Sequence, residues 1–226
     1  MLNAVLDAVH KRSPRSRATT LALRSLITSD LAAALPLHIS LSASLSLTTD
    51  NKDMFLDRLT ASLKSMRGLR QFEVKLTDLL WAPNYDRTRW FLVVGIERPA
   101  QDELNLLLKC CNHVCKQSGL PTLYMASSER DRSGREGAAA TPMRQRKIDS
   151  PGLSPDDYSD MFHFSLGWSL EKPSKEMIDF GGVEEKVSED LRDIRAQFDS
   201  VKVKIGNTIT SVPLGRTQNP DKSVLI

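Results

Sequence analysis

The stretches LPLHISLSASLSL (residues 35–47) and MFHFSLGWSL (residues 161–170) decide the fold, because each alternates apolar with polar residues. A period of two is typical of a strand that buries one face and leaves the other polar. Both stretches are therefore predicted to be strands, and the polar face of each carries the tripeptide His-x-Ser. The polar faces carry His38, Ser40, His163 and Ser165, and the expected buried faces carry Leu37, Ile39, Leu41, Leu45 and Leu47 in the first strand and Phe162, Phe164, Leu166, Trp168 and Leu170 in the second.

A similar order of elements follows each predicted strand, so the chain reads as a duplicated unit. Apolar residues at helical spacing predict helices, and alternating or wholly apolar runs predict further strands. The expected elements are a short helix at 21–31, a helix capped by Asp50 and stopped by Gly68, strands at 72–76 and 90–96, a helix at 100–118, a helix at 184–199, and strands at 201–205 and 209–212. The run at 90–96 is apolar on both sides, which favours a central place in the sheet. The predicted fold is α+β, with two pseudo-symmetric strand–helix–strand–strand lobes and a central cleft.

Three segments depart from this pattern in composition. Residues 1–20 include KRSPRSR and are expected to form a flexible basic segment, which is either solvated, a localisation signal or a phosphate contact. Residues 126–160 are rich in Ser, Arg, Asp, Gly and Pro, so a disordered surface insertion is expected there. The bilobed domain is expected to span 21–214, followed by a tail at 215–226.

Composition sets only broad limits on function. The chain has 226 residues, of which 40% are hydrophobic and 26% charged, as in an ordinary globular domain. Its net charge of +3 is a mild basic bias, compatible with a nucleic-acid partner. No run approaches the roughly 18 apolar residues of a membrane span, so no membrane partner is expected. The N-terminal residues do not have the pattern of a secretory signal.

Three cysteines crowd into the sequence CCNHVC at 110–115. Their odd number and close spacing argue against a disulfide framework and favour a reducing compartment. A zinc site would need a second pair of ligands elsewhere, and the sequence has no second cluster. Thiols buried on a helix are the favoured interpretation, and no metal or other cofactor is expected.

Two imidazoles and two hydroxyls that face one phosphate could cleave a phosphodiester without a metal. Imidazole titrates near about pH 6.5, so one copy can be neutral and accept a proton while the other is protonated and donates one. The hydroxyls can donate to the non-bridging oxygens, where charge builds up. One His-x-Ser is more often a half-exposed polar face, but two copies at equivalent places favour a site. The rival chemistry is a serine nucleophile, for which the G-x-S-x-G elbow is missing.

These two stretches, with TRWFLVVGIERPAQDELNLLLKCCNHV between them, resemble the signature regions of the two-histidine phosphodiesterase superfamily. Within it, the resemblance is to the U6 small nuclear RNA phosphodiesterase family, its fungal members in particular. It covers residues 29–214 apart from the expected insertion. Ala43 stands where that family often has arginine, and the strand that usually precedes its N-terminal helix is not recognisable before Leu21.

The resemblance implies a nuclear, monomeric 3′-to-5′ exonuclease that trims the oligouridine 3′ end of a single-stranded RNA. It also implies attack by a 2′-hydroxyl and a 2′,3′-cyclic phosphate product, which some fungal members then open. Residue by residue, it implies that His38 and His163 are the catalytic pair. Because both rings must reach one phosphate, the two repeated motifs predict that they lie across one cleft with imidazoles about 5–8 Å apart. Ser40 and Ser165 would hold the phosphate. Tyr124 would stack on a nucleotide, or else lie at the edge of the core.

Two alternatives stay open from the sequence. One is a cyclic phosphodiesterase that acts on RNA ends with the same residues. The other is an RNA-binding protein without activity. The sequence leaves undecided which histidine is the acid and which the base.

Overall fold

The computed structural model describes residues 21–84, 86–124, 157–174 and 190–216, and two compact units divide them. Unit 1 consists of Met1–Ser40, Lys75–Glu97 and Tyr124–Ile194, and unit 2 of Leu41–Val74, Arg98–Leu123 and Arg195–Ile226. Each unit therefore combines segments from both halves of the chain. The expected correspondence of one lobe to each half is wrong in this respect, although the α+β class is confirmed.

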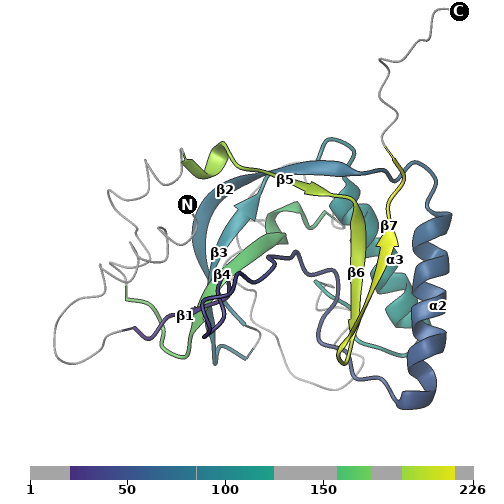
Figure 1. The fold of residues 1–226 in the computed structure, drawn as a ribbon, viewed down its shortest axis with the longest axis horizontal. Coiled ribbons are helices and arrows are strands. Elements are labelled where there is room, and N and C mark those ends of the chain that lie inside the picture. The colour runs from purple at the N-terminus through teal and green to yellow at the C-terminus, as the bar shows by residue number, and fades with distance from the viewer. Residues whose placement is uncertain (1–20, 85, 125–156, 175–189, 217–226) are drawn as a thin grey trace, which may run out of the picture. The chain divides into compact units, whose positions relative to one another are not determined.

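An antiparallel sheet forms the framework of unit 1 (Figure 1). Its strand order within this unit is β1-β4-β3-β2, where β1 is Arg24–Ser25, β4 is His163–Ser169, β3 is Trp90–Ile96 and β2 is Phe72–Pro83. Because β3 lies between β4 and β2, the predicted central place of this apolar run is confirmed. β2 extends well beyond the predicted strand, since its residues after Leu79 continue to pair with β3.

A bulge in β4 changes which side chains face which way. Val93 pairs with Ser165, but the next residue back, Leu92, pairs with Gly167, so Leu166 has no partner on β3. An extra residue of this kind shifts the alternation of the strand by one position. Trp168 therefore comes opposite Phe91, on the same face as Ser165 and His163. The prediction that Trp168 shares the buried face of Phe164 is wrong, because that prediction assumed an uninterrupted period.

Unit 2 contains two helices and a hairpin. Helix α2, Thr49–Ser65, buries Phe55, Leu59 and Leu63, and packs against α3, Glu103–Gln117. Strands β6, Ser200–Ile205, and β7, Thr208–Pro213, form the predicted hairpin, and Gly206 at its turn has a positive φ of 59°. Both predicted helices are confirmed.

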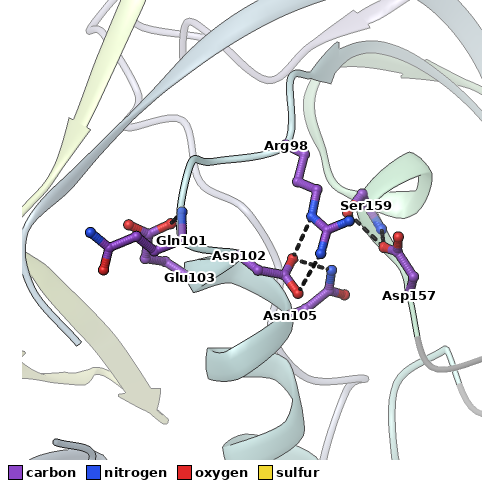
Figure 2. A network of polar contacts seen from close by, with 7 residues as sticks. All are labelled: Arg98, Gln101, Asp102, Glu103, Asn105, Asp157 and Ser159. Atoms are coloured by element: carbon purple, nitrogen blue, oxygen red, sulfur yellow. Dashed lines mark hydrogen bonds and ion pairs between the residues drawn. The ribbon is translucent and has the colours of Figure 1, made fainter. Parts of the chain in front are cut away.

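Both helices begin at different residues from those predicted. Thr48 occupies the N-cap of α2, so Asp50 lies in the first turn instead. At α3, Asp102 takes a left-handed φ of 60° and bonds Arg98 at 3.0 Å and Asn105 at 2.6 Å (Figure 2). These bonds to its side chain hold the chain in a turn, which delays the helix to Glu103.

The predicted strand at residues 37–47 is wrong. The side chains there do alternate between half-buried and exposed, but the backbone pairs with none of the described strands. Alternating polarity indicates only that one side of an extended segment is buried. An unpaired extended segment on a protein surface shows the same alternation as a strand. The place beside β4 is taken instead by β1, through the pairs Arg24 with Trp168 and Ser25 with Gly167.

The predicted helix at 21–31 is also wrong. Arg24 and Ser25 form β1, and the Ser25 hydroxyl accepts hydrogen bonds from the backbone N–H groups of Ile27 at 3.1 Å and Thr28 at 3.0 Å. A serine side chain that bonds its neighbours in this way offers the backbone an alternative to a helix. The segment turns, and Thr28 bridges back to Ala34.

The predicted helix at 184–199 is correct only in part. Residues 184–189 lie outside the described part of the chain, residues 190–192 are helical, and Arg195–Phe198 is strand β5. The spacing of four between Ile194 and Phe198 fits a strand as well as a helix. Phe198 stacks on Phe72 of β2 with ring centroids 5.3 Å apart, which stabilises the extended form.

The last four residues of the expected insertion at 126–160 belong to the described part of the chain. Most of it falls outside the described residues, but Asp157 is buried and its carboxylate accepts bonds from the N–H and hydroxyl of Ser159 at 2.9 and 2.7 Å (Figure 2). A 3-10 turn, η2 at Ser159–Met161, then leads into β4. The predicted segment 1–20 and residues 217–226 of the predicted tail at 215–226 also lie outside the described residues, whereas Gly215 accepts a hydrogen bond from the backbone N–H of Gln71 at 2.7 Å. In the described part of the chain, no helix has the length and apolar character needed to cross a membrane.

Candidate functional site

The residues predicted to carry chemistry all belong to unit 1. His163 opens β4 and is half-buried, and Ser165 follows on the same face, opposite Val93 of β3. His38 and Ser40 lie in the extended segment before α2, where both are exposed. Unit 1 therefore holds both copies of His-x-Ser, although only the second copy is on a strand.

The ring of His163 is oriented by a backbone carbonyl. Its Nδ1 lies 2.8 Å from the carbonyl oxygen of Met161. A carbonyl can only accept a hydrogen bond, so Nδ1 must carry the proton that is shared. In the neutral ring this leaves Nε2 with a free lone pair, able to accept a proton from a substrate.

The electrostatic surroundings favour the neutral form of His163. Burial lowers the pKa of His163 below its ordinary value of 6.5, because removing water disfavours the charged ring. The bond to Met161 opposes this shift, and the charge of His38 adds to it. That last effect also requires the two rings to lie close enough for one charge to disfavour the other.

The two seryl hydroxyls are open to a ligand. Ser40 is exposed and Ser165 half-buried, and neither side chain has a hydrogen-bond partner among the residues that the structure describes. Hydroxyls of this kind can donate to phosphate oxygens. Their predicted role in holding the phosphate stays a prediction, as does the catalytic role of the histidines.

Tyr124 reaches the same carbonyl as His163. Its hydroxyl donates to the Met161 oxygen at 3.1 Å, and burial raises the pKa of Tyr124 to about 12. Its ring is 6.1 Å from that of Tyr158 and 6.2 Å, edge-on, from that of Phe162. The residue is thus built into the edge of a small core around Met161, where its hydroxyl steadies the group that orients His163. A stacking role toward a nucleotide stays a prediction.

One group beside these residues was missed by the sequence reasoning. The bulge turns Trp168 to the face of His163, and the guanidinium groups of Arg24 and Arg89 lie over its ring at 5.1 and 5.0 Å from the centroid. A signal for the bulge was present in the sequence, because a glycine inside a strand, here Gly167, often marks one.

The cysteine cluster lies on α3 in unit 2. Cys111 and Cys115 are buried and Cys110 partly so, as the helix interpretation predicts, and burial raises the pKa of Cys111 to about 12. His113 is exposed, with its Nε2 2.9 Å from the side-chain nitrogen of Gln117. Among the described residues no three His, Cys, Asp or Glu side chains gather as a metal site would need.

Comparisons with known proteins identify a family to which the sequence matches. A family model described as HVSL, an uncharacterised conserved protein, matches residues 1–213. U6 snRNA phosphodiesterase 1 of Neurospora crassa is 30% identical over 216 residues, which cover 84% of this chain and 50% of that protein. The chain thus spans about half the length of this curated relative.

Two solved structures of Usb1 from Kluyveromyces marxianus share the fold. The first has a TM-score of 0.54 at 17% identity, and the match covers 94% of this chain and 86% of that one. The second, with uridine monophosphate, has a TM-score of 0.56 at 16% identity and covers 94% and 87%. At 16–17% sequence identity, this similarity shows a shared fold and no more. The shared fold agrees with the predicted fold class.

Proposed function

The chain belongs to the HVSL family, and on that premise we propose that it is a 3′-to-5′ RNA phosphodiesterase that trims an oligouridine 3′ end, with U6 small nuclear RNA as its substrate. The name of the Neurospora crassa relative supports the substrate, and the Usb1 structure with uridine monophosphate supports a uridine end. The nucleus is then the place of action, and a monomer is the proposed working form.

The mechanism is a transesterification within the last two nucleotides. The 2′-hydroxyl of the penultimate nucleotide attacks the adjacent phosphorus and forms a 2′,3′-cyclic phosphate. The bond from phosphorus to the 5′-oxygen of the terminal nucleoside breaks, and that oxygen takes up a proton. Ser40 and Ser165 donate hydrogen bonds to the non-bridging oxygens, which carry more charge in the transition state.

We assign the base to His163 and the acid to His38. The neutral His163 ring has Nε2 free for the proton of the 2′-hydroxyl, since Nδ1 is committed to Met161. Burial and the nearby His38 both disfavour a second proton on this ring. His38, which is exposed, donates to the leaving 5′-oxygen. Each transfer is typically worth about 10²–10⁴-fold in rate.

A single observation carries the proposal: a half-buried histidine with a fixed tautomer shares a face with a free hydroxyl and interacts with a second histidine. This combination supplies a base, an acid and a phosphate ligand without a carboxylate. A divalent ion would require oxygen ligands, which the proposed site does not use.

The deciding experiment incubates the protein with a 5′-labelled RNA that ends in oligouridine, in excess EDTA, and resolves product length and end group. The expected products shorten one nucleotide at a time and end in a cyclic phosphate. A matched RNA with a 2′-deoxy penultimate nucleotide should not be cleaved, because the attacking hydroxyl is absent. Trimming of that RNA at the normal rate would refute the transesterification.

The same experiment separates the two alternatives. An open 3′-phosphate in place of the cyclic end would indicate that the protein also opens the ring, as a cyclic phosphodiesterase does. Unchanged RNA that is nevertheless retained in a complex would indicate a binding protein. Activity that is lost in EDTA and restored by magnesium would contradict the metal-independent mechanism.

A further inference from the structure

Trp168 and two arginines form a cationic surface on the face of the sheet that carries His163. Trp168 is half-buried, whereas Arg24 and Arg89 are both exposed. Their guanidinium carbons lie 5.1 and 5.0 Å from the centroid of the Trp168 ring. We call these three residues the arginine clamp.

Among the described residues, no carboxylate neutralises the two positive charges of the clamp. Neither guanidinium forms an ion pair with a carboxylate of the described residues. Stacking on an aromatic ring orients a guanidinium but does not neutralise it. Arg24 reaches the ring from β1 and Arg89 from the turn before β3, and each guanidinium keeps a charge that can bind an anionic group.

The backbone fixes both arginines in place. Arg24 lies directly opposite Trp168 in the pairing of β1 with β4. Arg89 ends the turn between β2 and β3, where the Asn84 side chain accepts a hydrogen bond from its N–H at 3.0 Å and the Asn84 N–H donates to its carbonyl at 2.9 Å. The two charges are therefore preorganised rather than carried by a loose segment.

The clamp lies farther along the strand than His163 and Ser165, the two β4 residues that we assign to the scissile phosphate. Trp168 lies opposite Phe91, while His163 lies opposite Gly95, so four residues of β3 separate them. At about 3.3 Å per residue, this is about 13 Å along the strand, and Ser165 is about 7 Å away. Other phosphates of the same RNA strand, one for each arginine, fit this position.

We propose that the arginine clamp binds the RNA backbone on the 5′ side of the scissile bond. The inference rests on the proposed function and deepens it. In the first cleavage of an RNA with a 3′-hydroxyl end, only a nucleoside lies on the 3′ side of the scissile bond, so any further phosphate on the protein must lie upstream. Guanidinium groups bind phosphate in a forked geometry, and exposed arginine planes accept stacked bases.

The test compares a double variant, Arg24→Gln with Arg89→Gln, with a matched control. Lys172→Gln serves as the control, because Lys172 stacks on Trp90 at 5.7 Å and Trp90 pairs with Ser169, on the other face of the same sheet end. Fluorescence anisotropy measures binding of a labelled 2′-O-methyl oligouridine hexamer, which cannot undergo transesterification. The measurement is repeated over a series of salt concentrations.

Loss of the clamp should weaken binding and reduce its dependence on salt. The slope of log K against log salt should fall by about 1.4 in the double variant, at about 0.7 per phosphate contact in a single strand. The dissociation constant at low salt should rise on the order of tenfold. The control should retain the slope of the unaltered protein. An unchanged slope in the double variant, an equal loss in the control, or no binding by the unaltered protein would overturn the clamp.

A second substrate allows the clamp and the proposed function to be tested independently. The dinucleotide UpU contains only the scissile phosphate, so its cleavage rate should be unchanged in the double variant while kcat/KM for longer RNA falls. If the double variant cleaved both UpU and longer RNA as fast as the unaltered protein does, the clamp would be refuted and the proposed function would stand. A clamp-dependent salt slope in a protein that cleaves neither substrate would refute the function and leave the clamp. If the double variant does not fold, Arg89→Gln alone can be tested, because Arg89 lies in an exposed turn. Its slope of log K against log salt should fall by about 0.7.

Discussion

At His163, one backbone hydrogen bond determines the chemistry that the ring can perform. The Met161 carbonyl holds the proton on Nδ1, so the nitrogen that meets a substrate is Nε2. Sequence alone placed His163 on a polar strand face but left its role as acid or base open. The tautomer and the burial that lowers its pKa come from packing around Met161, which the sequence pattern does not encode.

The pH dependence of cleavage should reflect the lowered pKa of His163. The base must be neutral, and its pKa lies below 6.5, so protonation sets in only on the acid side of that value. The rate should therefore hold as pH falls to 6.5 and decline below it, with an acid limb that is lost in His163→Gln. A profile of kcat/KM from pH 4.5 to 8 measures this. An acid limb that inflects above 6.5 would contradict the assignment of the base.

Tyr124 should act through its hydroxyl. Tyr124→Phe removes one donor to the Met161 carbonyl and keeps the ring in place, so we expect kcat to fall about two- to tenfold with little change in KM. The acid limb of the pH profile should also shift, because the carbonyl that orients His163 is less firmly held. Tyr124→Leu is the comparison. If Tyr124→Phe is unimpaired and Tyr124→Leu shows a raised KM, the result would instead support a role of the Tyr124 ring in stacking on a nucleotide.

Among the elements, β4 shows what the period of two predicts correctly and what it does not. The alternation correctly put His163 and Ser165 on one face, but the bulge after Ser165 moved Trp168 to that face as well. A bulge depends on how two strands pair, and periodicity in one strand cannot report it. β1 was missed for a related reason, since a strand of two residues is too short to display a period.

The close packing beside His163 should be sensitive to one methyl group. Gly95 pairs with His163, and a Cβ at Gly95 would lie 2.5 Å from Oγ1 of Thr77. We expect Gly95→Ala to lower the free energy of unfolding by about 1–3 kcal/mol and to slow cleavage. Thr77→Ala in the same chain should recover most of both losses, because it removes the obstructing atom. Urea unfolding and cleavage rates measure the two effects.

Gly167 provides the contrast to this rescue. A Cβ there would lie 2.9 Å from the backbone oxygen of Arg24, which no side-chain replacement removes. Gly167→Ala should therefore destabilise the pairing of β1 with β4 without a single-site remedy. If Thr77→Ala failed to rescue Gly95→Ala, the proposed contact would not be the cause of the loss.

For the whole molecule, most segments with a regular apolar pattern were predicted well, whereas others took a structure that their local pattern did not predict. Helices α2 and α3, the central strand β3 and the hairpin of β6 with β7 follow from apolar spacing, since each buries one face. Residues 37–47 alternate without pairing, and residues 195–198 pair although they fit a helix. In both cases the available partner, rather than the local pattern, decided the structure.

The two units also explain why the sequence placed the chemistry better than the architecture. Internal similarity suggested one lobe for each half, yet both copies of His-x-Ser belong to unit 1. The His-x-Ser motif is local, so its identification does not depend on how the segments of the chain are divided between the two units. Which segments cluster together depends on long-range contacts that a single sequence does not display.

The central claim is that His38 and His163 act on one phosphodiester in one transition state. Single-turnover cleavage of oligouridine RNA by His38→Ala, His163→Ala and the double variant tests it most directly, with RNA affinity measured alongside. Each single change should slow cleavage by about 10²-fold or more with little change in affinity, and the double variant should be far less impaired than the product of the two losses. A single variant that cleaves at the normal rate, or losses that multiply in full, would contradict the claim.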